Sequence, residues 1–496
     1  MSYLDLLKLA APEVLVVLTA LVVLVLDLTS MRGLNLRVRL GINGLIACVG
    51  CAAAIAWLLV IPAQGQVAGG MLVADSLTAL VKIVVLSLTI FTVLLSFNAK
   101  FTAHVGEYLA LVLFAAVGMM FLVSAEDILM IFVSLEMTSL SLYVLTAFNK
   151  RNIKSAEAAL KYFLFGGMAA AFMLFGLSLI YGLSGATNLH AIAAALAGKG
   201  LDPLLVVAMV MTVIGFGFKV AAVPFHLWAP DAYEGAPTPS AALIASGSKV
   251  ASFFIASRVL MIGFEGQALE GSAAWRDYAS GWMPLIAVVA GLSMILGNLA
   301  AIVQRNVKRL LAYSAIAHAG YALLGILSND ASGTASLIYY VATYGLTVVG
   351  AFGVVSVVEN LKGDSKLTDF IGLSRRAPVV ALCMLVFMLS LAGIPPLAGF
   401  FGKFYVFLAA AGAGQNLGLL WLVILAIAMS AVSLYYYLQV LKQIYVVEAK
   451  DGNQGMEVPV FSQAVLVVIA ILVVGLGCFP NLLVGPLQSC LAATGH

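Results

Sequence analysis

A lysine placed beside a proline gives this sequence its clearest chemical signal. Lys219 follows ten uncharged residues in an apolar segment, and Pro224 comes five residues later. A lysine in the hydrocarbon core of a membrane costs about 2.5–3.5 kcal/mol even on the lenient insertion scale, so it is functional by default. Proline breaks a helix, and broken helices beside ionisable groups form the ion sites of many transporters. The stretch therefore predicts an ion or proton site.

The amino-acid composition indicates which class of protein this site belongs to. Of the 496 residues, 63% are hydrophobic and only 9% are charged, and the mean hydropathy is +1.11. These values exclude an ordinary soluble protein, and apolar runs of about 18 residues or more indicate membrane spans. The net charge of +3 does not indicate nucleic-acid binding.

The apolar runs predict an all-α polytopic membrane protein with about 14 transmembrane helices. The alanine-rich stretch 188–199 is expected to form a short surface helix. The predicted spans are 8–28, 40–61, 73–96, 107–124, 128–148, 156–182, 203–224, 238–263, 281–303, 309–328, 333–358, 378–408, 416–446 and 459–480.

Two groups of five spans divide the chain. We expect an N-terminal three-helix segment at 1–106, five-helix groups at 107–264 and 281–446, and a C-terminal helix in 447–496. An odd number of helices inverts the second group, as in many transporters. Each group has a broken helix, and the second is interrupted at Gly393–Gly399. Lys219 precedes its proline whereas Lys403 follows its pair, so the two groups match imperfectly.

Basic loop residues gather on one side of this topology. Because cytoplasmic loops carry the excess of Lys and Arg, both termini are expected outside and the loop with His226 inside. The outer side holds only Lys8, Lys199 and Arg276. The expected inner side holds Arg32, Arg37, Arg39, Lys100, Lys150, Arg151, Lys154, Arg305, Lys308, Arg309, Lys362, Lys366, Arg375, Arg376, Lys442 and Lys450.

Several titratable residues are expected at one depth. A helical rise of about 1.5 Å per residue puts Glu136 and His318 about 14 Å, and Lys249 about 15 Å, from their helix starts, close to the middle of a ~30 Å hydrocarbon core. Lys219 and Lys403 sit near helix breaks at similar depth. We call these five residues the midplane row, and we expect its members to face the bundle interior and pair there.

A row of this composition favours proton transfer. Burial lowers the pKa of a lysine and a nearby carboxylate raises it, so movement of a carboxylate can switch a lysine between charged and neutral. Moving a proton against ~150 mV costs about 3.5 kcal/mol, and a pKa change of about 3 corresponds to ~4 kcal/mol. Hard cations such as sodium and calcium need several oxygen ligands, whereas this row has Glu136 as its one clear acid.

Other ionisable residues leave alternatives open. Lys161 is shallower, about 10 Å past Lys154 by the helical rise. His226 could receive protons or simply cap the broken helix. Lys82 lies two turns after Asp75, too far for a direct pair along the helix, so its role is open between structural and functional. Arg258 is near the outer end of its helix and can snorkel.

Motifs for other chemistry are weak. Cys48 and Cys51 lie inside an apolar helix without a nearby histidine, which favours packing over haem or zinc binding. Gly215-Phe216-Gly217 is only a fragment of a dinucleotide fingerprint, and its glycines favour close helix packing over nucleotide binding. The tyrosines 435–437 and Trp421 are interpreted as packing or interface residues.

Three stretches carry a resemblance to a known family. GFGFKVAAVPFHLWAPDAYEGAPTP, VSLEMTSLSLYVL around Glu136, and LAGIPPLAGFFGKF resemble the antiporter-like membrane subunits of the proton-pumping NADH–quinone oxidoreductase, respiratory complex I. The resemblance covers about residues 75–450. Tyr233-Glu234-Gly235 and Lys403, with no long C-terminal lateral helix, resemble the subunit N group of that family.

The resemblance implies roles at matching positions. Glu136 and Lys219 would form the ion pair of an input half-channel, Lys249 and His318 a central relay, and Lys403 the output, with Lys161 modulating. It implies no cofactor in this chain: FMN, iron–sulfur clusters and NADH would belong to partner subunits.

The family also implies a location and partners. The chain would lie in the bacterial inner membrane, with both termini periplasmic and with other membrane subunits of the complex on both sides. A secondary cation/proton antiporter subunit, and a scaffold whose buried charges do no transport, are the alternative hypotheses.

Overall fold

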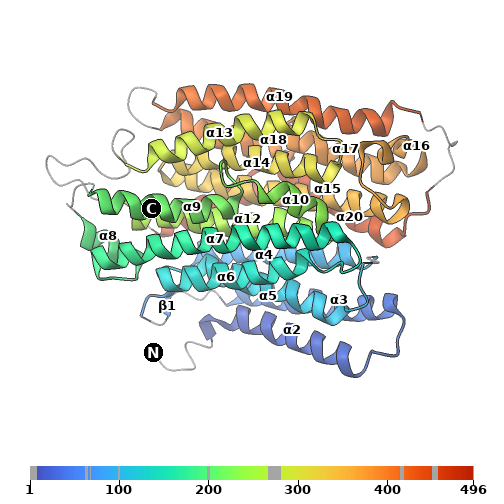
Figure 1. Ribbon diagram of the computed structural model, residues 1–496, viewed down its shortest axis with the longest axis horizontal. Coiled ribbons are helices and arrows are strands. Elements are labelled where there is room, and N and C mark those ends of the chain that lie inside the picture. The colour runs from blue at the N-terminus through green and yellow to red at the C-terminus, as the bar shows by residue number, and fades with distance from the viewer. Residues whose placement is uncertain are drawn as a thin grey trace.

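The computed structural model describes residues 8–61, 65–67, 69–98, 101–197, 202–265, 281–413, 418–448 and 456–494. Within these ranges the chain is a bundle of helices with one two-stranded antiparallel sheet. The long helices lie side by side along the horizontal direction of Figure 1. Helix α8 (Leu189–Leu196) lies at one end of the bundle and helix α16 (Leu373–Arg376) at the other, and we call these the α8 end and the α16 end.

The N-terminal segment contributes three long helices and both strands. Asp75 caps the third helix by accepting the Thr78 backbone N–H at 2.6 Å, the arrangement of a capping box. Buried Asp27 accepts hydrogen bonds from Arg39 at 2.6 Å and from the backbone N–H of Gly106 at 2.9 Å, which joins the segment to the next helix. The elements are α2 (Ala11–Thr29), α3 (Leu36–Val60), β1 (Gly65–Val67), β2 (Leu72–Ala74) and α4 (Ser76–Ser96).

The middle of the chain contains two interrupted helices. The predicted break before Pro224 is present, but much of the stretch predicted as a loop forms helix α10. The short helix expected within 188–199 is confirmed as α8. The elements are α5 (Val105–Ser124), α6 (Ile128–Thr146), α7 (Ile153–Ser184), α8 (Leu189–Leu196), α9 (Pro203–Val220), α10 (Trp228–Gly235), α11 (Thr238–Ala245), α12 (Gly247–Arg258) and η1 (Val259–Gly263).

The interruption between α11 and α12 was not predicted. Ser246 has φ −117° and ψ −86°, outside the helical region, within the span expected to run without a break from 238 to 263. The sequence gives no proline or glycine signal before that residue, although Gly247 follows it.

The last third of the chain contains the second predicted break. It separates α17 from α18, as the glycine–proline stretch indicated. The elements are α13 (Met283–Ile302), α14 (Val307–Leu327), α15 (Ala331–Lys362), η2 (Leu367–Phe370), α16 (Leu373–Arg376), α17 (Pro378–Ala392), α18 (Ala398–Gly412), α19 (Leu420–Tyr445), α20 (Val460–Cys478) and α21 (Asn481–Thr494).

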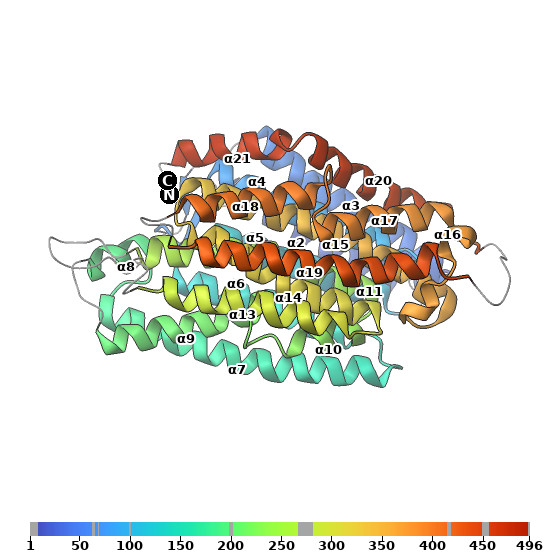
Figure 2. The same ribbon diagram turned by 90° about the horizontal axis from the view of Figure 1, so that it is seen from above.

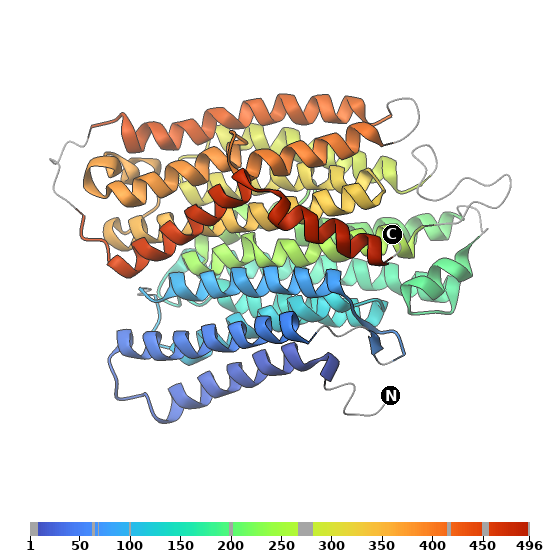
Figure 3. The same ribbon diagram turned by 180° about the vertical axis from the view of Figure 1, so that it is seen from behind.

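The count of membrane crossings agrees with the prediction. Among the described residues, thirteen helices are long and apolar enough to cross a membrane, and the shorter α17 and α18 cover the predicted span 378–408, with α18 continuing to Gly412. The C-terminal part differs, because two helices stand where one was expected. Helix α20 reaches the middle of the bundle and α21 continues to the α8 end, where α2 also begins (Figure 3).

Burial separates the central helices from the peripheral ones. The most apolar windows of 238–263 and of α15 are 100% buried, whereas that of α3 is 28% buried. Figure 2 shows α7 and α9 along one edge and α20 and α21 along the opposite edge. The interior helices α11, α12, α14 and α15 therefore offer the surroundings in which buried charges must find partners inside the protein.

Candidate functional site

A close pair of charges lies beside the first helix break. Nζ of Lys219 on α9 is 4.0 Å from Oε1 of Glu136 on α6, and their side chains are 8% and 25% exposed. The ammonium also donates a hydrogen bond to Oγ of Ser139, which is almost one turn after Glu136. Among the described residues neither Lys219 nor Glu136 makes another ion pair. The structure thus brings together the two residues expected to pair.

The break itself positions Lys219. Helix α9 ends at Val220, and the lysine occupies its last turn, where free carbonyls favour a cation. Backbone groups released by the break find partners: the indole N–H of Trp228 donates to the Phe218 carbonyl at 3.0 Å, and the Val223 N–H donates to Ser293 Oγ at 2.9 Å. These bonds allow irregular backbone inside a membrane protein, where unpaired groups are costly.

Lys249 lies just after the unpredicted break at Ser246. Its ammonium donates to the Ala315 carbonyl of α14 at 2.7 Å and lies 5.9 Å from the centre of the Tyr344 ring. The side chain is buried, with 2% of the residue exposed. In the described part of the chain no carboxylate pairs with Lys249. The hydrogen bond to Ala315 and the face of the Tyr344 ring therefore offset the cost of burying its positive charge.

His318 stands between two phenols. Its Nδ1 is 2.6 Å from Tyr340 Oη of α15, and its Nε2 is 3.1 Å from Tyr437 Oη of α19. Tyr437 Oη is also 2.5 Å from Ser314 Oγ. Neutral imidazole has one donor and one acceptor nitrogen, so one phenol donates to the ring while the other accepts from it.

Lys403 lies on α18, just after the second helix break. It donates to the Ala392 carbonyl at 3.0 Å and to Ser430 Oγ at 2.8 Å, and lies 5.2 Å from the centre of the Tyr321 ring. The His318 and Tyr321 rings are 5.7 Å apart. Aromatic side chains therefore connect the surroundings of Lys403 with those of His318.

Two clusters result rather than one continuous row. The first holds Glu136 and Lys219, and the second holds Lys249, His318 and Lys403. Between the ammonium groups of Lys219 and Lys249, the described residues form no hydrogen-bonded connection of side chains. All five residues come from different helices, α6, α9, α12, α14 and α18.

Lys161 lies outside both clusters. Its ammonium pairs with Glu157 at 2.6 Å and with Asp231 at 2.8 Å, and its side chain is 39% exposed. Asp231 on α10 also accepts from Arg309 of α14 at 2.6 Å. His226, in the segment between α9 and α10, is half-buried and its Nδ1 has no hydrogen-bond partner.

The charges around Asp231 connect the first interrupted helix to its neighbours. Burial alone would raise the pKa of Asp231, but hydrogen bonds from Lys161 and Arg309 hold it below its ordinary value. Arg309 also donates to Glu234 at 3.1 Å, and Lys154 pairs with Glu234 at 2.9 Å. Helix α10 is therefore held to α7 and α14 by side chains of opposite charge.

The structure answers an open question about one basic residue and corrects an expectation about another. The role of Lys82 was open, and Lys82 forms a buried ion pair with Glu13 of α2 at 2.6 Å. Arg258 does not snorkel to solvent, since it is 7% exposed and pairs with Asp75 at 3.2 Å and Glu126 at 3.3 Å. All three partners come from distant parts of the sequence, which helical spacing does not reveal.

Sequence reasoning also missed polar residues around the row. Tyr437 was interpreted as a packing or interface residue, yet it is fully buried and bonded to His318. Tyr340 and Ser139 were not considered. A serine almost one turn after Glu136 is a usable signal, whereas the partners of His318 depend on the packing of α15 and α19. Tyr435 is 56% exposed, which is compatible with the interface role considered for it.

Comparisons with known proteins agree with this geometry. Residues 125–430 match the family model described as NADH:quinone oxidoreductase/Mrp antiporter, TM. A relative from Acidobacterium capsulatum, named NADH-quinone oxidoreductase subunit N 2, is 52% identical and covers 97% of this chain and 98% of its own length.

Solved structures give the same assignment. A chain of respiratory complex I from Thermus thermophilus matches with a TM-score of 0.77 and 33% identity, over 96% of this chain and 98% of that one. A chain of the Mrp complex from a Dietzia species has a TM-score of 0.83 at 21% identity, over 98% and 97% of the two chains, and shows a shared fold. The chain therefore belongs to the NADH:quinone oxidoreductase/Mrp antiporter family, among the subunit N proteins of NADH–quinone oxidoreductase.

Proposed function

We propose that this chain, a proton-translocating membrane subunit of NADH–quinone oxidoreductase, moves protons through the midplane row. The observation that carries the proposal is the Glu136–Lys219 pair at a helix break, 4.0 Å apart. A pair at this separation can open and close with small movements of the interrupted helix, which changes the charge felt by the lysine proton. Coupling to quinone reduction would act on the chain through this pair.

We assign the residues of the two clusters to successive steps of proton transfer. Glu136 and Lys219 form the input pair, and Lys249 with His318 forms the central relay. Lys403 is the output, because its ammonium sits at the far break and its partners are a carbonyl and a serine rather than a carboxylate. Lys161 and His226 lie toward the α16 side of the first break and modulate or receive protons there.

Tyr340 and Tyr437 extend the relay. Each phenol contacts one ring nitrogen of His318, so a proton gained at one nitrogen can be matched by a proton lost at the other. Ser314, bonded to Tyr437, continues the connection on α14. This arrangement supports a relay in which the imidazole passes protons without moving far.

The distribution of basic residues supports one orientation of the chain in the membrane. The positive-inside pattern supports an α16 end in the cytoplasm and an α8 end outside, where α2 begins and α21 ends. Lys150, Arg309 and Arg375 belong to the α16 end, while Lys100, Lys199, Arg276 and Lys450 lie outside the described residues. The two five-helix groups, 107–264 and 281–446, would be inverted repeats, with α9–α10 and α17–α18 as their interrupted helices.

Partners and cofactors are part of the proposal. The family supports contacts with further membrane subunits on both sides, with FMN, iron–sulfur clusters and NADH held by partner subunits. Among the described residues no group of three or more His, Cys, Asp or Glu is arranged to hold a metal.

The test is made in the assembled complex. Lys219→Met and Lys249→Met should each lower proton pumping and coupled quinone reduction while subunit content stays normal, whereas Lys442→Met on the exposed surface of α19 should not. Full pumping in assembled Lys219→Met and Lys249→Met complexes would refute the proposal and favour a scaffold. Pumping that requires sodium would refute it in favour of a cation/proton antiporter.

A further inference from the structure

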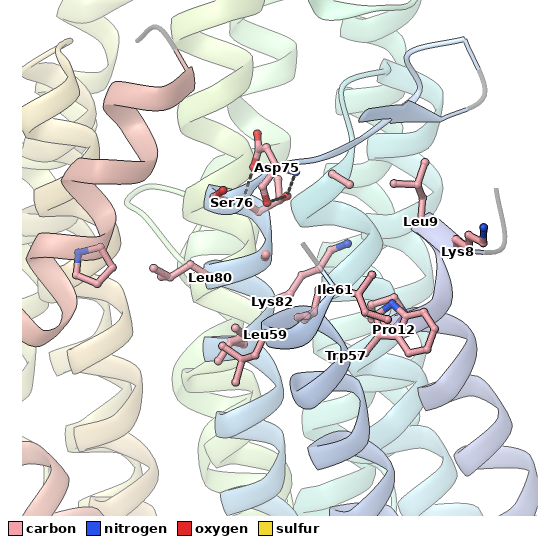
Figure 4. Close-up of a pocket in the computed structure, with 16 residues that line it drawn as sticks. Lys8, Leu9, Pro12, Trp57, Leu59, Ile61, Asp75, Ser76, Leu80 and Lys82 are labelled. Carbon is pink, nitrogen blue, oxygen red and sulfur yellow. Dashed lines mark hydrogen bonds between the residues drawn. The ribbon is translucent and has the colours of Figure 1, made fainter. Parts of the chain in front are cut away.

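A cavity that the proton pathway does not use lies at the α8 end. It has a volume of about 380 Å³ and is lined by the starts of α2 and α4, the end of α3 and Pro486 of α21. Figure 4 shows Lys8, Pro12 and Trp57 on one side of it and Asp75 on the other, with Lys82 between them. Because it lies at the ends of membrane helices, it is at the depth of the lipid headgroups.

The walls of the cavity are apolar and continue onto the lipid-facing surface. Leu59 and Ile61 line it from α3 and the residue that follows this helix, and Leu80 and Ile83 line it from α4. Leu59 is 67% exposed and the adjacent Val60 is 76% exposed. A hydrocarbon chain can therefore leave the cavity along α3 without crossing a polar surface.

Two polar groups of the cavity, the Trp57 indole and the Lys8 ammonium, are open to a ligand. The indole N–H of Trp57 is buried and has no hydrogen-bond partner, which is unusual for a buried donor. Lys8 is exposed and, among the described residues, makes no ion pair. The first turn of α2 also lines the cavity, through Pro12.

The other charges of the lining are already matched. Lys82 pairs with Glu13 at 2.6 Å, and Asp75 pairs with Arg258 at 3.2 Å. Among the described residues, the charge of the lining that has no ion-pair partner is thus that of Lys8, in the same cavity as the unpaired N–H of Trp57. A ligand that satisfies both must be an anion with hydrogen-bond acceptors, and the apolar walls require that it carry a hydrocarbon part.

We propose that this cavity binds a membrane phospholipid, whose phosphate accepts hydrogen bonds from Trp57 and Lys8 and whose acyl chains lie against Leu59 and Val60. The volume falls within the ~300–1,000 Å³ typical of small-molecule sites, which suits a headgroup and the first part of the chains. Interfacial tryptophan and lysine are the usual anchors at this depth. The lipid would connect the N-terminal helices α2 and α3 with α4 and with α21 near the C-terminus.

Native mass spectrometry of the complex from phosphatidylglycerol-containing nanodiscs tests the site. Trp57→Phe keeps the ring and removes the donor, and Lys8→Ala removes the charge. Each variant should retain one phospholipid fewer per chain than wild type after mild detergent washing. Lys442→Ala, an exposed lysine at the other end of the bundle, should retain the wild-type number. Equal retention in all four proteins would overturn the proposal.

A photoreactive residue introduced at position 59 identifies the occupant directly. Crosslinks to phospholipid support the proposal, and crosslinks to a neighbouring protein subunit overturn it. Inorganic phosphate that protects the site as well as phosphatidylglycerol does would also overturn it, because the acyl chains would then contribute nothing. If Trp57→Phe fails to assemble, Lys8→Ala and the crosslink still decide the question.

Discussion

Glu136 Oε1 and Lys219 Nζ are 4.0 Å apart, at the limit of an ion pair, while Lys219 donates its hydrogen bond to Ser139. The carboxylate therefore influences the lysine through its charge more than through a direct bond. By contrast, Glu13 and Lys82 are in direct contact at 2.6 Å. The looser pair sits at a helix break and the tighter one joins two uninterrupted helices, which fits a movable pair and a fixed pair.

Glu136→Gln should separate charge from shape at the loose pair. The amide keeps the volume of the side chain but removes the negative charge near Lys219. We expect proton pumping and coupled quinone reduction to fall at least about tenfold, since positioned acid–base groups contribute typically 10²–10⁴-fold. Proton uptake into vesicles and quinone reduction measure this. Glu448→Gln, on an exposed pair with Arg375, is the control, and wild-type pumping in Glu136→Gln would contradict the role of the charge.

Tyr437→Phe should slow proton transfer at His318. The change removes one of the two phenols that bond the imidazole and leaves Ser314 without that partner. An unpaired buried polar group costs about 1–3 kcal/mol, so a moderate fall in thermal stability is also expected. The solvent isotope effect on pumping separates the two effects, because lost stability alone would not change it. Tyr435→Phe, on an exposed neighbour, should leave both quantities at wild-type values.

The sequence was sufficient for the parts of the fold that local patterns encode. Apolar runs predicted the crossings, and prolines 224, 395 and 396 predicted two of the three helix breaks. Helical rise placed Glu136, Lys249 and His318 at similar depth. The partners of these residues depend on contacts between helices far apart in the chain, so the Ala315 carbonyl at Lys249 and the phenols at His318 could not be predicted. The break at Ser246 was not predicted either, because no proline or glycine directly before that residue signals it.

Lys82→Met should destabilise the N-terminal helices without blocking the pump. It leaves the buried Glu13 carboxylate unpaired, and removing one partner of a buried ion pair costs about 3–5 kcal/mol. Replacing both residues, in Lys82→Met with Glu13→Leu, removes the uncompensated charge and should restore most of the stability. Thermal unfolding of the purified complexes measures this. A double variant as unstable as the single one would show that the residues do not act as a pair.

Acidification should weaken the attachment of α10, because Asp231 has a lowered pKa in the folded protein. A carboxyl group of this kind adds stability above its unfolded pKa, about 3.9, and this stability is lost as pH falls through the lower folded pKa. Asp231→Asn should therefore be less stable than wild type at pH 7, with a difference that shrinks below about pH 4. Thermal unfolding from pH 7 to pH 3 measures the difference. Arg309→Lys keeps the charge but loses the guanidinium group, whose Nη1 donates to both Asp231 and Glu234, so its stability should fall between those of wild type and Asp231→Asn. A stability difference between wild type and Asp231→Asn that does not change with pH would show that the pair adds no electrostatic stability.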